Sequence, residues 1–161
     1  MTTKLDENYS NKSELECDRW FSGFASVWFT DADRTPRYHP IDWSGNTHDG
    51  RIAAIELKTR NYDSTMKTAW IESSKLLRLL MAGYYEDKVP LYINHWSNNR
   101  ISVHRLLPED PLPLASQKRA KNPGMGNVYT ETLKCELDMD DAWLFDDKTY
   151  KLIRGPKHEP K

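Results

Sequence analysis

The sequence contains few cysteines. Cys17 and Cys135 are the two cysteines among 161 residues, and neither has a second cysteine within a few positions. Disulfide frameworks need several cysteine pairs, and structural zinc sites need cysteines or histidines clustered at short spacing. A disulfide-stabilised scaffold is therefore excluded and a structural zinc site is disfavoured. We expect both thiols to be free, as in a reducing cytosol.

Long apolar segments are also missing. No stretch of the sequence approaches the roughly 18 consecutive apolar residues that a membrane-spanning helix requires. Residues 1–11 are polar, so no signal peptide is expected at this end. Together these two absences predict a cytoplasmic protein.

The chain has almost no net charge. Its 23 Lys and Arg residues are balanced by 24 Asp and Glu residues, which gives a formal net charge of −1. Proteins that coat nucleic acid with their whole surface carry a large excess of positive charge. A nucleic-acid partner would therefore have to bind at a local basic patch. A metal site rich in carboxylates would itself lower the total charge.

Length and apolar content predict one folded domain. A chain of 161 residues with 38% hydrophobic residues can bury one core but not two. We expect a flexible N-terminal segment over residues 1–12, a single domain over 13–156 and a loose tail over 157–161. Within the domain, residues 107–156 are expected to form a loop-rich C-terminal extension.

Helical and extended patterns alternate in the first half of the chain. Ser13 and Glu16 fit a capping box, which predicts a helix that begins near Ser13 and ends at Gly23. A charged, proline-containing connection is expected over residues 31–37. The strands expected in this half are residues 24–29, 38–43 and 51–59, the last two forming a hairpin.

The second half begins with another predicted helix. Ser73 or Ser74 can cap a helix that extends to Met81 and ends at Gly83. Pairing of 90–96 with 100–106 is expected, because Asn98 and Asn99 suit a hairpin turn. The other features expected here are a loop over 108–126 with a helical turn near 115–120, a strand over 128–137 and a helical turn over 140–145. This order predicts an α/β protein in which a mixed sheet carries a helix on each face.

Residues 38–60 contain the most informative chemical pattern. In a strand, residues i and i+2 point to the same face, so Glu56 and Lys58 are expected to project together. Asp42, at the end of the paired strand, would approach Glu56. Two adjacent carboxylates repel each other unless a cation lies between them, and Mg²⁺ or Mn²⁺ suits such oxygen ligands. The carbonyl of Leu57 is a further candidate ligand.

This pattern resembles that of the PD-(D/E)xK nuclease superfamily, whose members share the restriction-endonuclease-like fold. In that superfamily an aspartate near the end of one strand precedes E-x-K on the next strand. Here Asp42 is separated by 13 residues from Glu56-Leu57-Lys58. The run over residues 56–60 is also similar to a strand of archaeal Holliday-junction resolvases and related small nucleases. The resemblance covers residues 13–106, and it departs from the superfamily pattern at Pro40, which lies two residues before Asp42 rather than directly before it.

The resemblance implies a restriction-endonuclease-like sheet core flanked by helices, and metal-dependent hydrolysis of phosphodiester bonds in nucleic acid, most simply DNA. In this interpretation Asp42 and Glu56 bind Mg²⁺ or Mn²⁺, Lys58 positions the attacking water, and either Glu14 or Glu16 assists. The basic residues expected to hold the phosphate backbone are Arg51, Arg60, Lys67, Lys75, Lys118, Arg119 and Lys121. Such folds often dimerise when they cut both strands of a duplex, although nothing in the sequence indicates a dimer seam.

Ordinary structural roles are the alternative for each of these residues. The Asp-Glu-Lys group could be a solvated ion pair worth under about 1 kcal/mol. Lys75 could be an exposed helix lysine, residues 118–121 a solvated loop, and Trp43 and Trp70 core residues rather than surfaces that stack on bases. The alternative for the whole protein is a catalytically inactive nuclease-fold module that binds nucleic acid or protein, such as a phage or mobile-element accessory factor.

Overall fold

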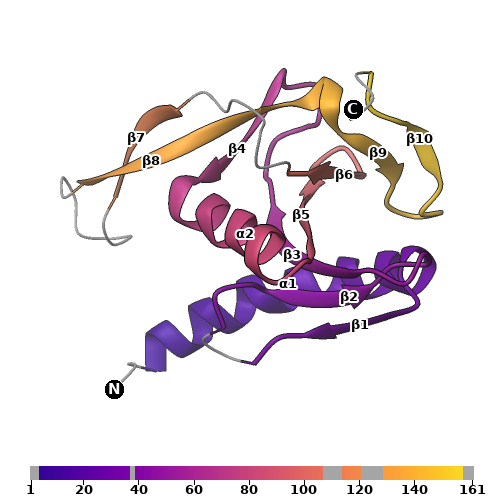
Figure 1. The fold of residues 1–161 in the computed structure, drawn as a ribbon. Helices are drawn as coiled ribbons and strands as arrows, with labels where there is room; N and C mark the ends of the chain where they lie inside the picture. Colours follow the sequence, from indigo (N-terminus) through magenta and orange to yellow (C-terminus); the bar gives the residue numbers. More distant parts are fainter. Residues whose placement is uncertain (1–3, 37–38, 107–113, 121–128, 158–161) are drawn as a thin grey trace.

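Two β-sheets and two α-helices make up the part of the chain that this computed structural model describes, residues 4–36, 39–106, 114–120 and 129–157 (Figure 1). Side chains are described over 15–36, 39–106 and 133–157. The larger sheet contains β1 (Asp31–Arg34), β2 (Trp43–Asn46), β3 (Ile52–Thr59), β5 (Val89–Trp96), β6 (Arg100–Arg105), β9 (Trp143–Asp146) and β10 (Leu152–Arg154), paired in that order. The smaller sheet contains β4 (Thr68–Glu72), β8 (Tyr129–Asp138) and β7 (Leu114–Ala120), also paired in that order.

Strands β3 and β5 lie side by side in the larger sheet and run in the same direction, whereas its other described pairs are antiparallel. A parallel pair needs a crossover connection, because the chain must return to the end of the sheet at which it started. Here the connection passes through β4 and helix α2 (Ser73–Tyr85). The register places Glu56 opposite Tyr92 and Lys58 opposite Asn94.

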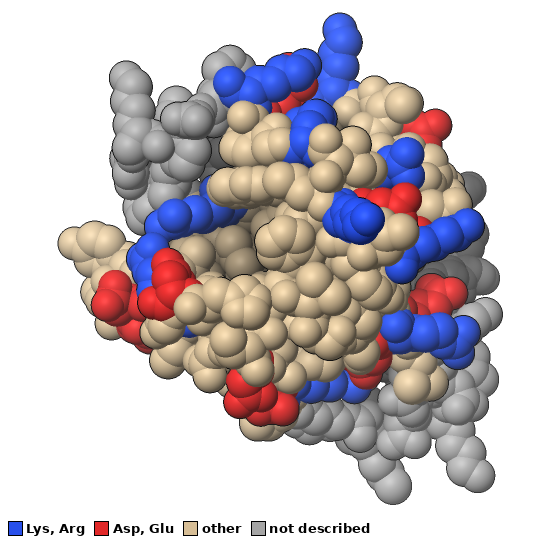
Figure 2. All heavy atoms as spheres, turned by 90° about the vertical axis from the view of Figure 1, so that its right-hand side faces the viewer, with Lys and Arg blue, Asp and Glu red and all other residues tan. Residues whose placement is uncertain are grey.

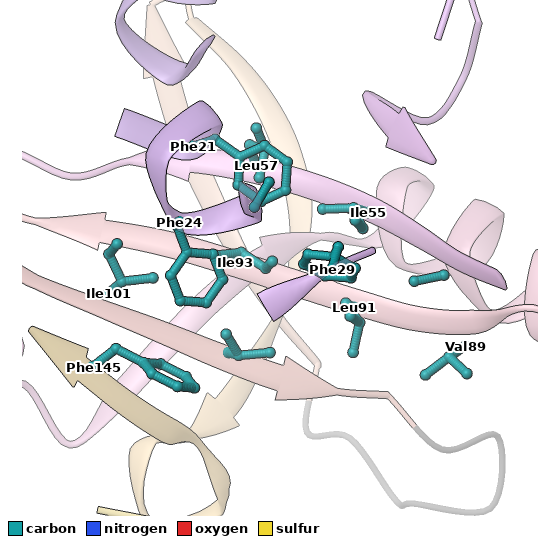
Figure 3. Close-up of a cluster of buried hydrophobic side chains, with 13 residues drawn as sticks. Phe21, Phe24, Phe29, Ile55, Leu57, Val89, Leu91, Ile93, Ile101 and Phe145 are labelled. Atoms are coloured by element: carbon teal, nitrogen blue, oxygen red, sulfur yellow. The ribbon is translucent and has the colours of Figure 1, made fainter. Parts of the chain in front are cut away.

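Two apolar clusters show which face of the sheet each helix covers. Leu57 clusters with Phe21 of helix α1 (Lys4–Trp28), as Figure 3 shows, whereas Ala54 clusters with Leu79 of α2. Because successive strand residues point to opposite faces, α1 and α2 cover opposite faces of β3 and Glu56 points to the α2 side. The predicted fold class, a mixed α/β sheet with a helix on each face, is confirmed.

Helix α1 is longer than the sequence predicted. It begins at Lys4 rather than near Ser13, and it continues through Gly23, where the prediction ended it. The helix therefore includes residues 4–12, and the predicted strand over 24–29 is wrong.

The buried face of α1 explains this extension. Phe24 and Ala25 continue, at positions i+3 and i+4, the buried stripe that Phe21 begins. Gly23 is tolerated within the helix because a neighbouring side chain needs the space: a β-carbon at this position would lie 2.0 Å from the Tyr150 hydroxyl oxygen. Tertiary packing thus decides where the helix ends, and the glycine does not act as a stop signal.

The first predicted hairpin is present, but its first strand is shifted. Strand β3 matches the predicted 51–59, whereas β2 begins at Trp43, where the predicted strand over 38–43 ends. Pro40 lacks the N–H that a ladder hydrogen bond requires, which disfavours a strand before Asp42. An additional strand, β1, forms within the predicted connection over 31–37 and pairs with β2.

Most of the predictions for the second half are confirmed. Helix α2 is present over Ser73–Tyr85, although its N-cap is Glu72 rather than Ser73 or Ser74 and it continues past the predicted end at Gly83. Strands β5 and β6 form the predicted hairpin with a φ of 60° at Asn99. Strand β8 agrees closely with the predicted strand over 128–137.

Two predicted helical turns in the second half are largely wrong. Strand β7 replaces the turn expected near 115–120, because its backbone pairs with β8. Strand β9 takes the second half of the turn expected over 140–145, and the short 3-10 helix Met139–Asp141 covers only its start. Strand β7 pairs with β8, the next strand along the chain, and β9 pairs with the more distant β6. Local turn signals do not report such backbone pairing.

The described surface shows no preference for one sign of charge on the face in Figure 2. On this side, Lys and Arg are interspersed with Asp and Glu around a largely uncharged central area. This agrees with the formal net charge of −1. None of the helices in the described ranges is both long and apolar enough to cross a membrane.

Candidate active site

The carboxylate of Asp42 lies next to the E-x-K segment of β3. Asp42 immediately precedes β2, and its Oδ2 accepts a hydrogen bond from the backbone N–H of Leu57 at 3.0 Å. The antiparallel register, in which Trp43 lies opposite Ile55, places Asp42 across from Glu56. Two acidic residues 14 positions apart in the sequence are thus brought together at one edge of β3.

Glu56 is the buried acid of this group. Its side chain is 3% exposed, and it points to the α2 side of the sheet. Burial, followed by the negative charge of Asp42, raises the pKa of Glu56 to about 7, against the opposing effects of Lys75 and Lys58. A carboxylate in this environment requires a nearby positive charge to remain ionised.

Lys75 provides the closest positive charge. This residue lies in the first turn of α2, and its Nζ is 2.5 Å from Oε1 of Glu56. Burial acts to lower the pKa of Lys75, but the Glu56 carboxylate outweighs this effect, so the pKa lies above its ordinary value. The ammonium is therefore charged at neutral pH and pairs with the buried carboxylate.

Lys58 is half-buried and shares the Glu56 face of β3 by strand alternation. Its positive charge acts on two neighbours: it opposes the increase that burial causes in the pKa values of Glu56 and Cys17. Burial is the main reason that the pKa of Cys17 is raised, and Asp42 raises it further. Asp42, Glu56, Lys58 and Lys75 thus form one electrostatic group at the C-terminal end of β3.

Arg60 lies in the interior, although the sequence suggested a contact with phosphate. The residue is 5% exposed. Its Nε donates to Oδ1 of Asn94 at 2.9 Å, and its Nη2 donates to the Tyr92 hydroxyl at 2.7 Å and to the Trp70 carbonyl at 2.5 Å. The guanidinium also lies 4.6 Å from the centroid of the Trp70 ring. Arg60 therefore links β3, β5 and β4, and we assign it a structural role.

The remaining predicted residues of the site lie on α1, at the other end of β3 or before β4. Glu16 is exposed, and Glu14 lies on α1 with its side chain outside the described part. Arg51 is exposed at the other end of β3, five positions before Glu56, which corresponds to about 16 Å of strand. Lys67 is exposed immediately before β4.

The basic cluster of the predicted long loop falls only partly within the described residues. Lys118 and Arg119 belong to β7, where they pair in register with Glu131 and Thr130 of β8, and their side chains are not described. Lys121 lies outside the described residues. Their contact with nucleic acid remains a prediction.

The donor atoms near Glu56 fit a hard divalent cation, though with few protein ligands. Asp42 and Glu56 supply carboxylate oxygens, and the buried Oε1 of Glu56 contacts the Lys75 ammonium. Among the described side chains, no group of three His, Cys, Asp or Glu residues is arranged to hold a metal. Two carboxylates, with the Leu57 carbonyl as a further candidate, suit Mg²⁺, which retains several waters when it binds to proteins.

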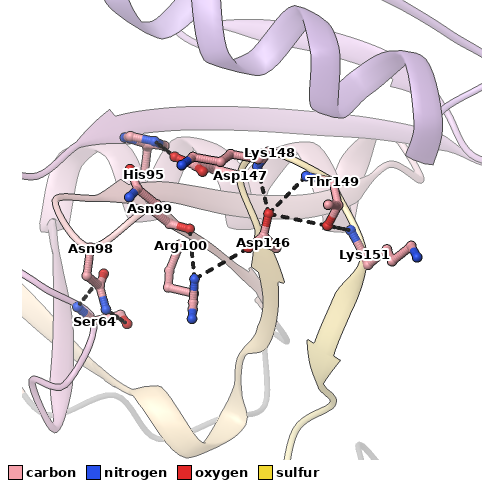
Figure 4. Close-up of polar contacts among 10 residues, drawn as sticks. All are labelled: Ser64, His95, Asn98, Asn99, Arg100, Asp146, Asp147, Lys148, Thr149 and Lys151. Atoms are coloured by element: carbon pink, nitrogen blue, oxygen red, sulfur yellow. Dashed lines mark hydrogen bonds and ion pairs between the residues drawn. The ribbon is translucent and has the colours of Figure 1, made fainter.

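A second polar group, not anticipated from the sequence, lies at the same end of β3 on the α1 face. His95 pairs in register with Thr59, and its Nε2 lies 2.8 Å from Oδ2 of Asp147 (Figure 4). Trp20 stacks on His95 with ring centroids 5.4 Å apart and donates to the Thr59 hydroxyl at 3.0 Å. These contacts anchor α1 to the strand that carries Glu56 and Lys58.

This chain shows only weak similarity to known proteins. The chain matches no described protein family and no curated protein. Among solved structures it is similar to Hjc, a Holliday junction resolvase from the archaeal hyperthermophile Archaeoglobus fulgidus, with 12% sequence identity and a TM-score of 0.46. The match covers 74% of this chain and 85% of the resolvase chain. Similarity at this level assigns neither an active site nor a substrate to this chain.

Proposed function

We propose that this protein is a metal-dependent nuclease that hydrolyses phosphodiester bonds in DNA, with Asp42, Glu56 and Lys58 at its active site. The observation that carries the proposal is the approach of Asp42 to the E-x-K segment, through the hydrogen bond from the Leu57 N–H to its carboxylate. This contact brings an acid from outside β3 beside the buried Glu56, with Lys58 two positions along the strand.

The electrostatics of Glu56 support a cation site. A carboxylate that is 3% exposed and adjacent to a second carboxylate is unfavourable unless positive charge is close. A divalent cation bound by Asp42 and Glu56 would provide that charge. When bound in such a site, Mg²⁺ or Mn²⁺ stabilises developing negative charge on phosphate and lowers the pKa of a coordinated water.

The other residues of the site bind phosphate groups of the DNA and orient the attacking water. Lys58, on the Glu56 face of β3, holds the attacking water and a phosphate oxygen in place through its ammonium. Lys67 and Lys75 contact the phosphate backbone on the α2 side, and Arg51 contacts more distant phosphates. Lys118, Arg119 and Lys121 extend this contact, and Glu14 or Glu16 assists from α1.

The test is cleavage of plasmid, single-stranded and branched DNA by the wild type and by Glu56→Gln, each with Mg²⁺, Mn²⁺ or EDTA. Glutamine keeps the size of the buried side chain and removes its charge. Glu86→Gln is the matched control, because Glu86 is exposed after the end of α2 and pairs with Lys88. We expect metal-dependent cleavage by the wild type and by Glu86→Gln, and none by Glu56→Gln.

The opposite result would favour the inactive binding module. If the wild type cleaves no DNA under any of these conditions and releases no heat on titration with Mg²⁺ or Mn²⁺, the nuclease proposal is wrong. Retention of DNA on the uncleaving protein at low salt would then identify a nucleic-acid-binding module. Absence of such binding would leave the protein-binding alternative.

A further inference from the structure

The closest cation to Glu56 comes from α2 and not from the E-x-K lysine. Nζ of Lys75 lies 2.5 Å from Oε1 of Glu56, 19 residues away in the sequence. Among the described side chains, this charge-assisted contact is the one that compensates the burial of Oε1. The Lys75 ammonium therefore lies at the carboxylate oxygen that a bound metal cation would use as a ligand.

The two partners of this pair differ in how easily they can move. The Glu56 side chain is 3% exposed and belongs to β3, whose backbone is paired on both sides by β2 and β5. The Lys75 side chain is 37% exposed and extends on a flexible stem from the first turn of α2. Lys75 can therefore turn toward solvent once its ion pair is replaced, whereas the Glu56 side chain is enclosed and has no comparable path.

The charges of the site also favour an exchangeable partner. Asp42 and Glu56 are two carboxylates side by side, and of the two nearby lysines Lys75 forms an ion pair with Glu56, while Lys58 acts on Glu56 from along the strand. A divalent cation would balance both, and it would repel the Lys75 ammonium from the same carboxylate.

We propose that Lys75 is a built-in counter-ion that a divalent cation displaces from Glu56. This inference rests on the proposed metal site. Without a metal, the ammonium stabilises the buried carboxylate and keeps it in place. When the metal binds, Lys75 swings toward solvent, where its charge becomes available to a phosphate group of the substrate.

The test is calorimetric titration with Mg²⁺, without DNA, at pH 8.5, where Glu56 of the wild type is ionised. The proteins are the wild type, Lys75→Met, Lys75→Gln and Arg78→Met. Arg78 is an exposed residue one turn further along α2, so its substitution removes the same charge from the same helix away from Glu56. If Lys75 competes with the metal, Lys75→Met and Lys75→Gln bind Mg²⁺ at least about 10-fold more tightly than the wild type, whereas Arg78→Met does not.

Thermal unfolding provides a second measurement on the same proteins. Loss of the counter-ion lowers the melting temperature of the metal-free Lys75 variants, and Mg²⁺ raises it by more than it raises that of the wild type. Circular dichroism before each titration shows that the variants are folded, and the glutamine variant retains a polar group opposite Glu56 if methionine is not tolerated.

The Mg²⁺ titrations distinguish failure of the Lys75 exchange from failure of the metal site itself. If the wild type binds Mg²⁺ through Glu56 but both Lys75 variants bind it equally or more weakly, Lys75 is not displaced and the exchange is wrong, while the proposed function stands. If neither the wild type nor any variant binds Mg²⁺, both the exchange and the metal site of the proposed function are wrong.

Discussion

Asp42 and Lys58 approach Glu56 from different positions, and this separates their proposed roles. Asp42 reaches β3 from the start of β2 and accepts a hydrogen bond from the Leu57 N–H, so it is placed to share a cation with Glu56. Lys58 is itself a cation and lies on the Glu56 face of β3. A positive side chain cannot be a metal ligand, so Lys58 must act on water or phosphate.

These roles predict different behaviour for two variants. Asp42→Asn is expected to lose DNA cleavage and to bind Mg²⁺ about 10-fold or more weakly, because one anionic ligand is gone. Lys58→Met is expected to lose cleavage by about 100-fold or more, as when one group that stabilises transition-state charge is removed, while it still binds Mg²⁺. Cleavage rates and calorimetry on the same preparations check both expectations. Cleavage by Lys58→Met at the wild-type rate would contradict the role given to this lysine.

The buried position of Glu56 also has a consequence for stability. Its pKa is about 7 in the folded chain, against 4.5 for an ordinary glutamate, because burial and the charge of Asp42 disfavour the ionised form. Between these two pH values the folded state binds a proton that the unfolded state has released. The contribution of Glu56 to the free energy of unfolding is therefore fully present below about pH 4.5 and is lost as the pH rises through 7.

Urea unfolding in EDTA at pH 5, 6, 7 and 8 measures this loss. The free energy of unfolding of the wild type, relative to that of Glu56→Gln, should fall by roughly 2 kcal/mol between pH 5 and pH 8. The comparison isolates Glu56, because other groups titrate alike in both proteins. A difference that is constant with pH, or that rises, would show that Glu56 is not destabilised by its burial.

Among the helices and strands, the ones best predicted from the sequence are those whose signal, a run of β-prone residues or a turn residue, lies within the segment itself. The extent of β3 and the hairpin of β5 and β6 are predictable from β-prone residues and from the turn residue Asn99, although β3 is buried on both faces and its Ile52 is exposed. Glu56 and Lys58 are assigned to one face by the strand period of two. The shared face of the candidate site follows from local geometry alone.

The elements that the sequence missed depend on contacts with distant residues. Helix α1 passes through Gly23 because Tyr150, 127 positions later, packs against the glycine. A glycine followed by β-prone residues predicts a helix end, and only the tertiary contact reverses that prediction.

The same reason explains which contacts of the site residues the sequence does not reveal. Arg60 is an ordinary basic residue in the sequence, and its hydrogen-bond partners Asn94 and Tyr92 lie more than 30 positions away. The sequence offers Lys75 as a phosphate contact or an exposed lysine, and its ion pair with Glu56 depends on how α2 packs on β3. Pairing between a buried acid and a helix lysine would have been predictable only with the packing of α2 already known.

For the whole molecule, the charge distribution limits how DNA could bind. The formal net charge is −1, and charges of both signs alternate on the face shown in Figure 2. Long-range attraction of a polyanion by the whole protein is therefore weak. Under the proposed function, binding must rely on a few cations, namely Lys58 and Lys75 beside the carboxylates and Lys67 before β4.

This restriction predicts a shallow dependence of DNA binding on salt. Each phosphate neutralised contributes about −0.9 to the slope of log K against log salt concentration for duplex DNA. In EDTA Lys75 pairs with Glu56, so contact by Lys58 and Lys67, with one or two further cations, predicts a slope of about −3 to −4, and Lys67→Met should make it shallower by about 1. Fluorescence anisotropy with labelled duplex in EDTA, between 50 and 300 mM salt, measures both slopes. A slope steeper than about −6 would mean that many more cations reach the DNA than the local group contains, and the basic residues of β7 and beyond would then carry most of the contact.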